Sequence, residues 1–286
     1  MIRIVVSRPN RSARFIVAAL GAWVLAAAAQ AQTVFSSAGA NATAITPTVD
    51  AFRSTLGTLN PNTAGSFGSG RREINWDGVP DAFAAPNLLP ANFFNVNSPR
   101  GVVFATPGSG FAVSANAGVG APQFGNIDPN YPTFFEPFSA QRLFTAIGSN
   151  IVDVSFFVPG GAQSALTRGF GVVFSDVDFA NTTSLSFFNQ SNALLGTYFA
   201  TPSGGNEGFS FLGVDFGAAS VARVRITSGN QFLAPGNTAL DNVAMDDFIY
   251  GEPTIVAVVP EPGTYALMLA GLGVLLALGR RQAARA

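Results

Sequence analysis

The chain has 286 residues, contains neither cysteine nor histidine, and draws all fifteen of its basic residues from arginine. These missing residue types exclude a disulfide framework, Ser-His-Asp and Cys-His nucleophiles, histidine-ligated zinc or haem, and lysine Schiff bases. Eight arginines and fifteen acidic residues lie between Gln32 and Val259, which gives this part a net charge of about −7. Because nucleic-acid affinity depends on neutralising phosphates, we expect no nucleic-acid partner.

Residues 1–31 have the pattern of a secretory signal peptide. Four arginines precede an uncharged apolar run over residues 15–29. Ala29 and Ala31 then flank Gln30 in an A-x-A cleavage site, so we predict that the mature chain begins at Gln32. Cleavage two residues earlier and an uncleaved N-terminal anchor are the alternatives.

Residues 32–72 are interpreted as a polar lead segment with one short helix. Residues 32–44 are small and polar, and we expect them to lack a fixed structure. Thr46 is the expected helix cap, Pro47 lies in the first turn, and Gly57 ends the helix. The apolar residues at helical spacing are Val49, Phe52, Leu56 and Leu59.

Residues 73–252 change to the two-residue alternation of β-strands, with many Gly- and Pro-rich turns between apolar segments. Nine or ten short strands with little helical periodicity predict an all-β domain, an antiparallel β-sandwich that is jelly-roll-like. Residues 253–259 are the expected linker to the C-terminal tail. The expected strands include 101–105, 111–115, 152–158, 171–176, 183–188, 194–199, 208–216, 221–226 and 243–250.

The residue types that remain permit carboxylate chemistry, such as a glycosidase pair or metal-assisted hydrolysis. No pair of acidic residues forms a recognisable catalytic motif, so we expect a protein that is not an enzyme. A secreted, carboxylate-dependent carbohydrate-active enzyme on the same sandwich is the alternative. Its candidate catalytic residues are Glu73, Glu136, Glu207 and Glu252, together with scattered aspartates.

Three acidic pairs are candidate calcium sites, because calcium prefers carboxylate and carbonyl oxygens in loops rich in Asp, Asn and Gly. None matches the EF-hand pattern, and Asp and Asn are also common in ordinary turns and edge strands. Calcium is therefore a candidate cofactor, and no other is expected. The pairs are Asp77 with Asp81, Asp176 with Asp178, and Asp246 with Asp247.

Carbohydrate binding commonly uses aromatic rings that stack on sugar faces, with polar groups beside them. Trp76 and Tyr131 are the candidate sugar contacts. Tyr131 lies between Asn130 and Pro132, a loop-like setting that favours exposure. Each of the two residues has the alternative of serving as part of the core.

The C-terminal tail, residues 260–286, begins with Pro260, Glu261 and Pro262. Proline fixes φ near −65° and disfavours helix in the residue before it, so this motif should hold the carboxylate of Glu261 on a stiff, non-helical segment.

An uncharged apolar run over residues 265–279 follows, and then the basic residues Arg280 and Arg281. We predict a transmembrane helix whose arginines stay in the cytoplasm. Fifteen residues span only about 22 Å against a hydrocarbon core of about 30 Å, which favours a transient anchor over a permanent one.

The order of these parts closely resembles the PEP-CTERM sorting signal of exported bacterial proteins. The resemblance covers about a tenth of the chain, and it implies that a membrane-embedded exosortase recognises and cleaves the tail. Such proteins commonly occur in bacteria that make exopolysaccharide. Residues 169–252 also resemble the sandwich domain of many PEP-CTERM proteins, a likeness of fold that carries no activity.

The resemblance implies an exported protein that passes through an intermediate anchored in the inner membrane and ends at the cell surface or outside the cell. The expected role is structural or adhesive, as in a biofilm, with exopolysaccharide as a candidate partner. An anchored periplasmic protein with an incidental Pro-Glu-Pro is the alternative.

Overall fold

A computed structural model of the chain describes residues 32–236, 240–255 and 262–283. The predicted signal peptide, with Ala29 and Ala31, lies outside the described residues, as do Pro260 and Glu261.

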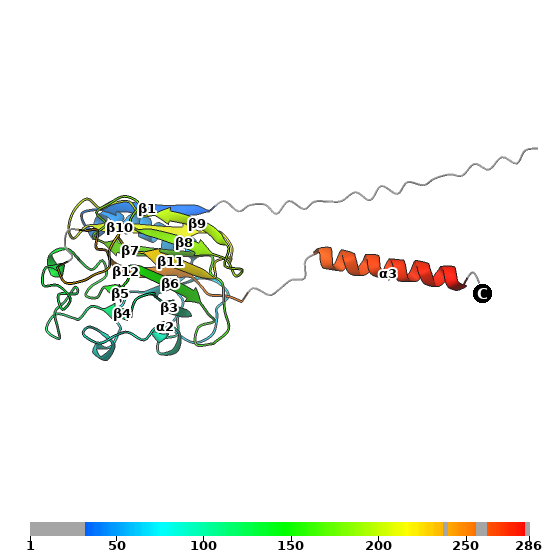
Figure 1. Cartoon of the computed structure of the whole chain (residues 1–286), viewed down its shortest axis with the longest axis horizontal. Coiled ribbons are helices and arrows are strands. Elements are labelled where there is room, and N and C mark those ends of the chain that lie inside the picture. Colours follow the sequence, from blue (N-terminus) through cyan, green and yellow to red (C-terminus); the bar gives the residue numbers. More distant parts are fainter. Residues whose placement is uncertain (1–31, 237–239, 256–261, 284–286) are drawn as a thin grey trace, which may run out of the picture. The chain divides into compact units, whose positions relative to one another are not determined.

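The body consists of two antiparallel sheets, which confirms the all-β prediction (Figure 1). The first sheet has the order β1-β10-β7-β12-β5-β4, with β2 also paired to β12, and the second has the order β3-β6-β11-β8-β9. The strands of the first sheet are β1 (Thr33–Gly39), β2 (Arg71–Ile74), β4 (Gly110–Val113), β5 (Phe144–Ile147), β7 (Gly169–Ser175), β10 (Phe209–Asp215) and β12 (Ala244–Gly251). Those of the second are β3 (Val102–Ala105), β6 (Ile151–Phe156), β8 (Ser184–Phe188), β9 (Leu194–Phe199) and β11 (Arg223–Thr227).

The main core lies between the two sheets and is rich in phenylalanine. Alternating residues of β6, such as Val152 and Val154, meet residues of the first sheet, such as Val172 and Phe248. Trp76 occupies the centre of an aromatic group, where its ring stacks on Phe144 at 4.1 Å. Such aromatic burial supplies much of the apolar area that stabilises a sandwich without disulfides.

A second core lies on the other face of the first sheet, under α1 (Ala42–Leu56). Phe52 of this helix packs among Val173, Phe211 and Ile249, whose neighbours along each strand point into the main core. The strands β7 and β10 are therefore buried on both faces and lack the alternation of polar residues that a half-exposed strand shows.

The helix begins one turn earlier than predicted. Asn41, rather than Thr46, is the N-cap, and its side-chain oxygen accepts a hydrogen bond from Ala44 N at 3.2 Å. The hydroxyl of Thr46 instead donates to Ala42 O at 2.8 Å, and Pro47 lies inside the helix. The helix ends before Gly57, as predicted, where φ is +101°.

Residues 33–39, expected to lack a fixed structure, form β1. All seven residues of this strand pair with β10 in an antiparallel register from Thr33–Asp215 to Gly39–Phe209. Apart from Val34 and Phe35, the side chains of this strand are small and carry little apolar signal. The strand is held by its backbone pairing with β10 and by the packing of Phe35 on Phe52. Short helical segments complete the body: α2 (Phe93–Val96), η1 (Asp81–Phe83) and η2 (Tyr131–Thr133).

The C-terminal segment forms α3 (Pro262–Ala283), with Pro262 at its first position, where a missing N–H costs nothing. This corrects the prediction of a transmembrane helix: among the described residues, no helix combines the length and the apolar character that crossing a bilayer requires. The apolar run covers only residues 265–279, and Arg280 and Arg281 already belong to the same helix.

Candidate functional site

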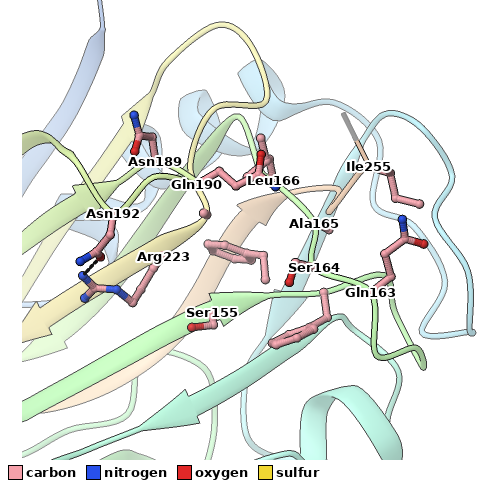
Figure 2. A pocket seen from close by; sticks show the side chains of 13 residues that line it. Ser155, Gln163, Ser164, Ala165, Leu166, Asn189, Gln190, Asn192, Arg223 and Ile255 are labelled. Carbon is pink, nitrogen blue, oxygen red and sulfur yellow. Dashed lines mark hydrogen bonds between the residues drawn. The ribbon is translucent and has the colours of Figure 1, made fainter. Parts of the chain in front are cut away.

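A pocket of about 620 Å³ opens on the second sheet, at the end of the body from which the chain leaves toward its tail (Figure 2). Its walls come from β6, the segment that follows β6, the turn between β8 and β9, the start of β11, and Ile255. Figure 2 shows Asn192 and Arg223 on one side and Gln163 and Ile255 on the opposite side.

The turn between β8 and β9 is held by the side chain of Asn189. Its Oδ1 accepts hydrogen bonds from Ser191 N at 3.0 Å and Ala193 N at 2.9 Å, in the manner of an Asx turn. Asn192 adopts φ of +58°, a conformation that asparagine tolerates better than most residues. The turn therefore presents Gln190 at the pocket from a well-defined backbone.

The opposite wall is held by backbone hydrogen bonds. Val158 N donates to Gln163 O at 2.8 Å, and Ala165 N donates to Phe156 O at 3.0 Å. Leu166 and Thr254 exchange two hydrogen bonds, each 2.9 Å long. This last pair fixes the segment after β12 and places Ile255 at the rim.

The charge of Arg223 is neutralised within the wall. Its guanidinium donates to Asp153 at 2.6 Å and to Asn192 Oδ1 at 2.7 Å, and it lies 3.8 Å from the ring centre of Phe188. Arg225 also donates twice to Asp153. Burial opposes the ionisation of Asp153, but the hydrogen bonds from both arginines outweigh it and hold the pKa of this carboxyl below its usual value.

The remaining polar groups of the pocket are uncharged. Gln163, Ser164, Gln190 and Ser155 make no side-chain hydrogen bond within the described part of the chain. None of the described residues that line the pocket is an aspartate or a glutamate. The arrangement can therefore exchange hydrogen bonds with a ligand, but it offers no carboxylate as an acid, a base or a metal ligand.

Of the candidate calcium residues, Asp77 and Asp81 both contact Arg142. Asp77 Oδ1 accepts from Arg142 N at 3.2 Å, and Asp81 forms an ion pair with the Arg142 guanidinium. Burial raises the pKa of Asp77. The two carboxylates are thus partners of a buried arginine.

Asp246 and Asp247 are buried and hold neighbouring chain segments together. Asp246 Oδ2 accepts from Phe138 N at 2.6 Å and Ser139 N at 3.1 Å, and Asp247 accepts from Arg53 at 2.8 Å and from the Ser139 hydroxyl at 2.7 Å. Burial raises the pKa of both carboxyls, and the charge of Asp247 raises that of Asp246 further. Their oxygens are engaged by protein donors rather than turned toward solvent.

Asp176 and Asp178 lie near a third carboxylate, that of Asp241. Asp176 has φ of +70°, and its buried Oδ1 has no hydrogen-bond partner among the described residues. Burial and the charges of Asp178 and Asp241 raise the pKa of Asp176 to about 8. Asp241 accepts from Asp178 N at 2.9 Å and from the Thr182 hydroxyl. Over residues 32–236, 240–255 and 262–283, no group of three or more His, Cys, Asp or Glu side chains is placed to hold a metal ion.

Both candidate sugar contacts lie in the interior. Trp76 is 1% exposed and its Nε1 donates to Asp246 O at 3.0 Å, while Tyr131 is fully buried and its hydroxyl donates to Ala234 O at 2.9 Å. This corrects the expectation that their rings face a ligand, since each polar edge already has a backbone partner. Sequence reasoning missed the pocket itself, because Gln163 and Gln190 lie in short neutral polar segments that look like ordinary turns.

The tail supplies the remaining candidate residues. Pro262 and Arg281 lie in α3, whose Arg280 is exposed.

No curated protein and no solved structure matches the chain. The family model of the PEP-CTERM protein-sorting motif matches residues 258–284, a span that contains every predicted motif residue from Pro260 to Arg281. The chain therefore carries a PEP-CTERM protein-sorting motif, the mark of an exported protein that an exosortase sorts.

Proposed function

We propose that this chain is an exported protein of the cell surface or extracellular matrix, with a structural or adhesive role and no enzymatic activity. The sorting motif at residues 258–284 is the observation that carries the proposal. The signal-peptide pattern of residues 1–31 and the acidic body without lysine or histidine support it.

In this proposal the tail acts first. The apolar residues 265–279 hold the exported chain at the inner membrane until the tail is removed. The exosortase then recognises Glu261 with its two flanking prolines and separates the body from the tail. A run of fifteen apolar residues suits a short-lived anchor, because its length of about 22 Å falls below the thickness of the hydrocarbon core.

The released body would then bind exopolysaccharide. Its polar, uncharged pocket offers hydrogen-bonding groups of the kind that sugar hydroxyls need. A binding role rather than a hydrolytic one is supported by the partners of two candidate glutamates: Glu73 pairs with Arg53 and Arg71, and Glu252 pairs with Arg72. Glycosidases need two carboxyls that flank a bound sugar.

Substitution of Glu261 tests the sorting step. In the producing bacterium, Glu261→Ala should accumulate as a membrane-bound, unprocessed precursor, which an immunoblot of membrane, surface and medium fractions will detect. Glu136→Ala removes an exposed carboxylate of the body and should be sorted as wild type. Normal processing and normal location of Glu261→Ala would refute the proposed recognition of Glu261 by the exosortase.

Incubation of the purified protein with the producer's exopolysaccharide tests the second step. We expect co-sedimentation without release of reducing ends. Release of reducing ends would instead establish a carbohydrate-active enzyme.

A further inference from the structure

We propose that the 620 Å³ pocket on the second sheet binds a short, uncharged oligosaccharide segment. The proposal deepens the function proposed above and rests on it only for the source of the glycan. The volume falls within the range of about 300–1,000 Å³ that small-ligand sites have.

The unused hydrogen-bonding groups are the first argument. Gln163 and Gln190 each offer an amide donor and an acceptor, and Ser155 and Ser164 each offer a hydroxyl. These side chains make no hydrogen bond within the described residues, whereas Asn189 and Asn192 beside them are fixed by hydrogen bonds of their own. A ligand that both donates and accepts, as sugar hydroxyls do, can satisfy all four.

Charge is the second argument, and it selects among glycans. Arg223 is the one cationic side chain among the described residues that line the pocket. Its guanidinium already donates hydrogen bonds to Asp153 and Asn192. An acidic sugar would therefore meet no cation that is free of protein partners. A cationic ligand would meet no carboxylate in the lining itself. A neutral glycan carries neither cost.

The apolar part of the lining is the third argument. Phe157, Leu166 and Ile255 lie among the polar groups, and the first two are half-buried. The C–H faces of a pyranose ring pack on such surfaces while its hydroxyls reach polar neighbours. A purely apolar ligand would leave the amides and hydroxyls without partners, which costs free energy when they are buried.

The site also lies close to the tail along the sequence. The two hydrogen bonds between Leu166 and Thr254 hold the start of the linker at the rim of the pocket. From Ile255 to Glu261 there are six residues, which reach at most about 22 Å when fully extended. A glycan in the pocket therefore lies at the end of the body from which this short connection to the sorting motif starts.

A glycan array that carries neutral and uronic-acid oligosaccharides tests the proposal with purified full-length protein. We expect binding to neutral oligosaccharides and none to uronic-acid ones. Calorimetry with the neutral oligosaccharide that binds best then compares the variants. Gln163→Ala/Gln190→Ala should weaken binding at least tenfold, and Ser164→Trp, which fills the pocket from an exposed position, should abolish it.

Asn87→Ala is the matched control. It removes an exposed amide that forms no side-chain hydrogen bond within the described residues and does not line the pocket, so it should bind as wild type. Circular dichroism spectra and melting temperatures should stay equal among the variants, since all altered side chains are solvent-exposed.

Two results would overturn the proposal: no binding to any neutral glycan, or binding that both pocket variants retain. If the pocket variants still co-sediment with exopolysaccharide, the pocket assignment fails while the proposed function stands. If Glu261→Ala is sorted normally but pocket-dependent glycan binding is found, the proposed sorting fails while the pocket assignment stands.

Discussion

Loss of one partner from the buried ion pair between Arg72 and Glu252 should be among the most destabilising single changes in the body. Both side chains are almost completely buried, at 0% and 1% exposure, and their closest contact is 2.6 Å. Arg72 also donates to four backbone carbonyls, and Glu252 accepts from Asn60 and from Phe67 N. The pair thus fixes the Gly- and Ser-rich loop that precedes β2 as well as the end of β12.

The variant Glu252→Ala leaves the Arg72 charge buried without its partner. Removing one member of a buried pair typically costs about 3–5 kcal/mol of unfolding free energy. Since about 1 kcal/mol shifts the melting temperature of a domain of this size by about 2–4 °C, we expect a decrease of about 6–20 °C. Chemical denaturation with a constant m-value should give the same free energy.

The pair between Arg53 and Asp50 is the matched control, because the side chain of Asp50 is 59% exposed and Arg53 keeps Glu73 and Asp247 as partners when Asp50 is removed. Asp50→Ala should cost no more than about 0.5 kcal/mol. The variant Arg72→Met/Glu252→Leu should also be less stable than wild type, because the four backbone carbonyls that accept hydrogen bonds from Arg72 would lose their donor. A loss below about 1 kcal/mol in Glu252→Ala would refute the reasoning that leaving this arginine unpaired is what costs stability.

Three further predictions concern pH, the helix cap and the pocket. Burial and two neighbouring carboxylates raise the pKa of Asp176 to about 8, so its contribution to stability is full below about pH 4 and is lost as the pH rises toward 8. Asp176→Asn should therefore melt higher than wild type at pH 8.5, with a difference that shrinks toward pH 4; a bound cation would reverse the sign and make the wild type sensitive to a chelator. Asn41→Ala should cost about 1 kcal/mol in urea unfolding, because it removes the hydrogen bond to Ala44 N, and an unchanged midpoint would contradict this cap assignment. Asp153→Asn should expose the charge of Arg223 and give the pocket affinity for uronic-acid oligosaccharides on the same array; continued rejection of acidic glycans would contradict the charge argument.

Features that short stretches of sequence encode could be predicted. The strand Leu194–Phe199 was expected over the same residues, and the end of α1 followed from Gly57. The sorting motif is likewise a linear pattern, and the family match covers it. In each case the determining residues are neighbours along the chain.

Features that depend on distant partners could not be predicted in this way. The strand Thr33–Gly39 is defined by pairing with β10, and Phe144–Ile147 is a short strand whose place in the sheet comes from β4 and β12. The pocket joins residues as far apart as Ser155 and Ile255, so no local pattern marks it. Trp76 was expected to be available to a ligand, but the surrounding phenylalanines enclose it.

The intact mass of the extracellular form of this protein tests the central claim most directly. The account predicts a chain that begins at Gln32 and lacks the apolar run and the terminal arginines of the tail. A mass that retains residues 265–285 would contradict processing at the sorting motif and, with it, the assignment of the body to the cell surface or matrix.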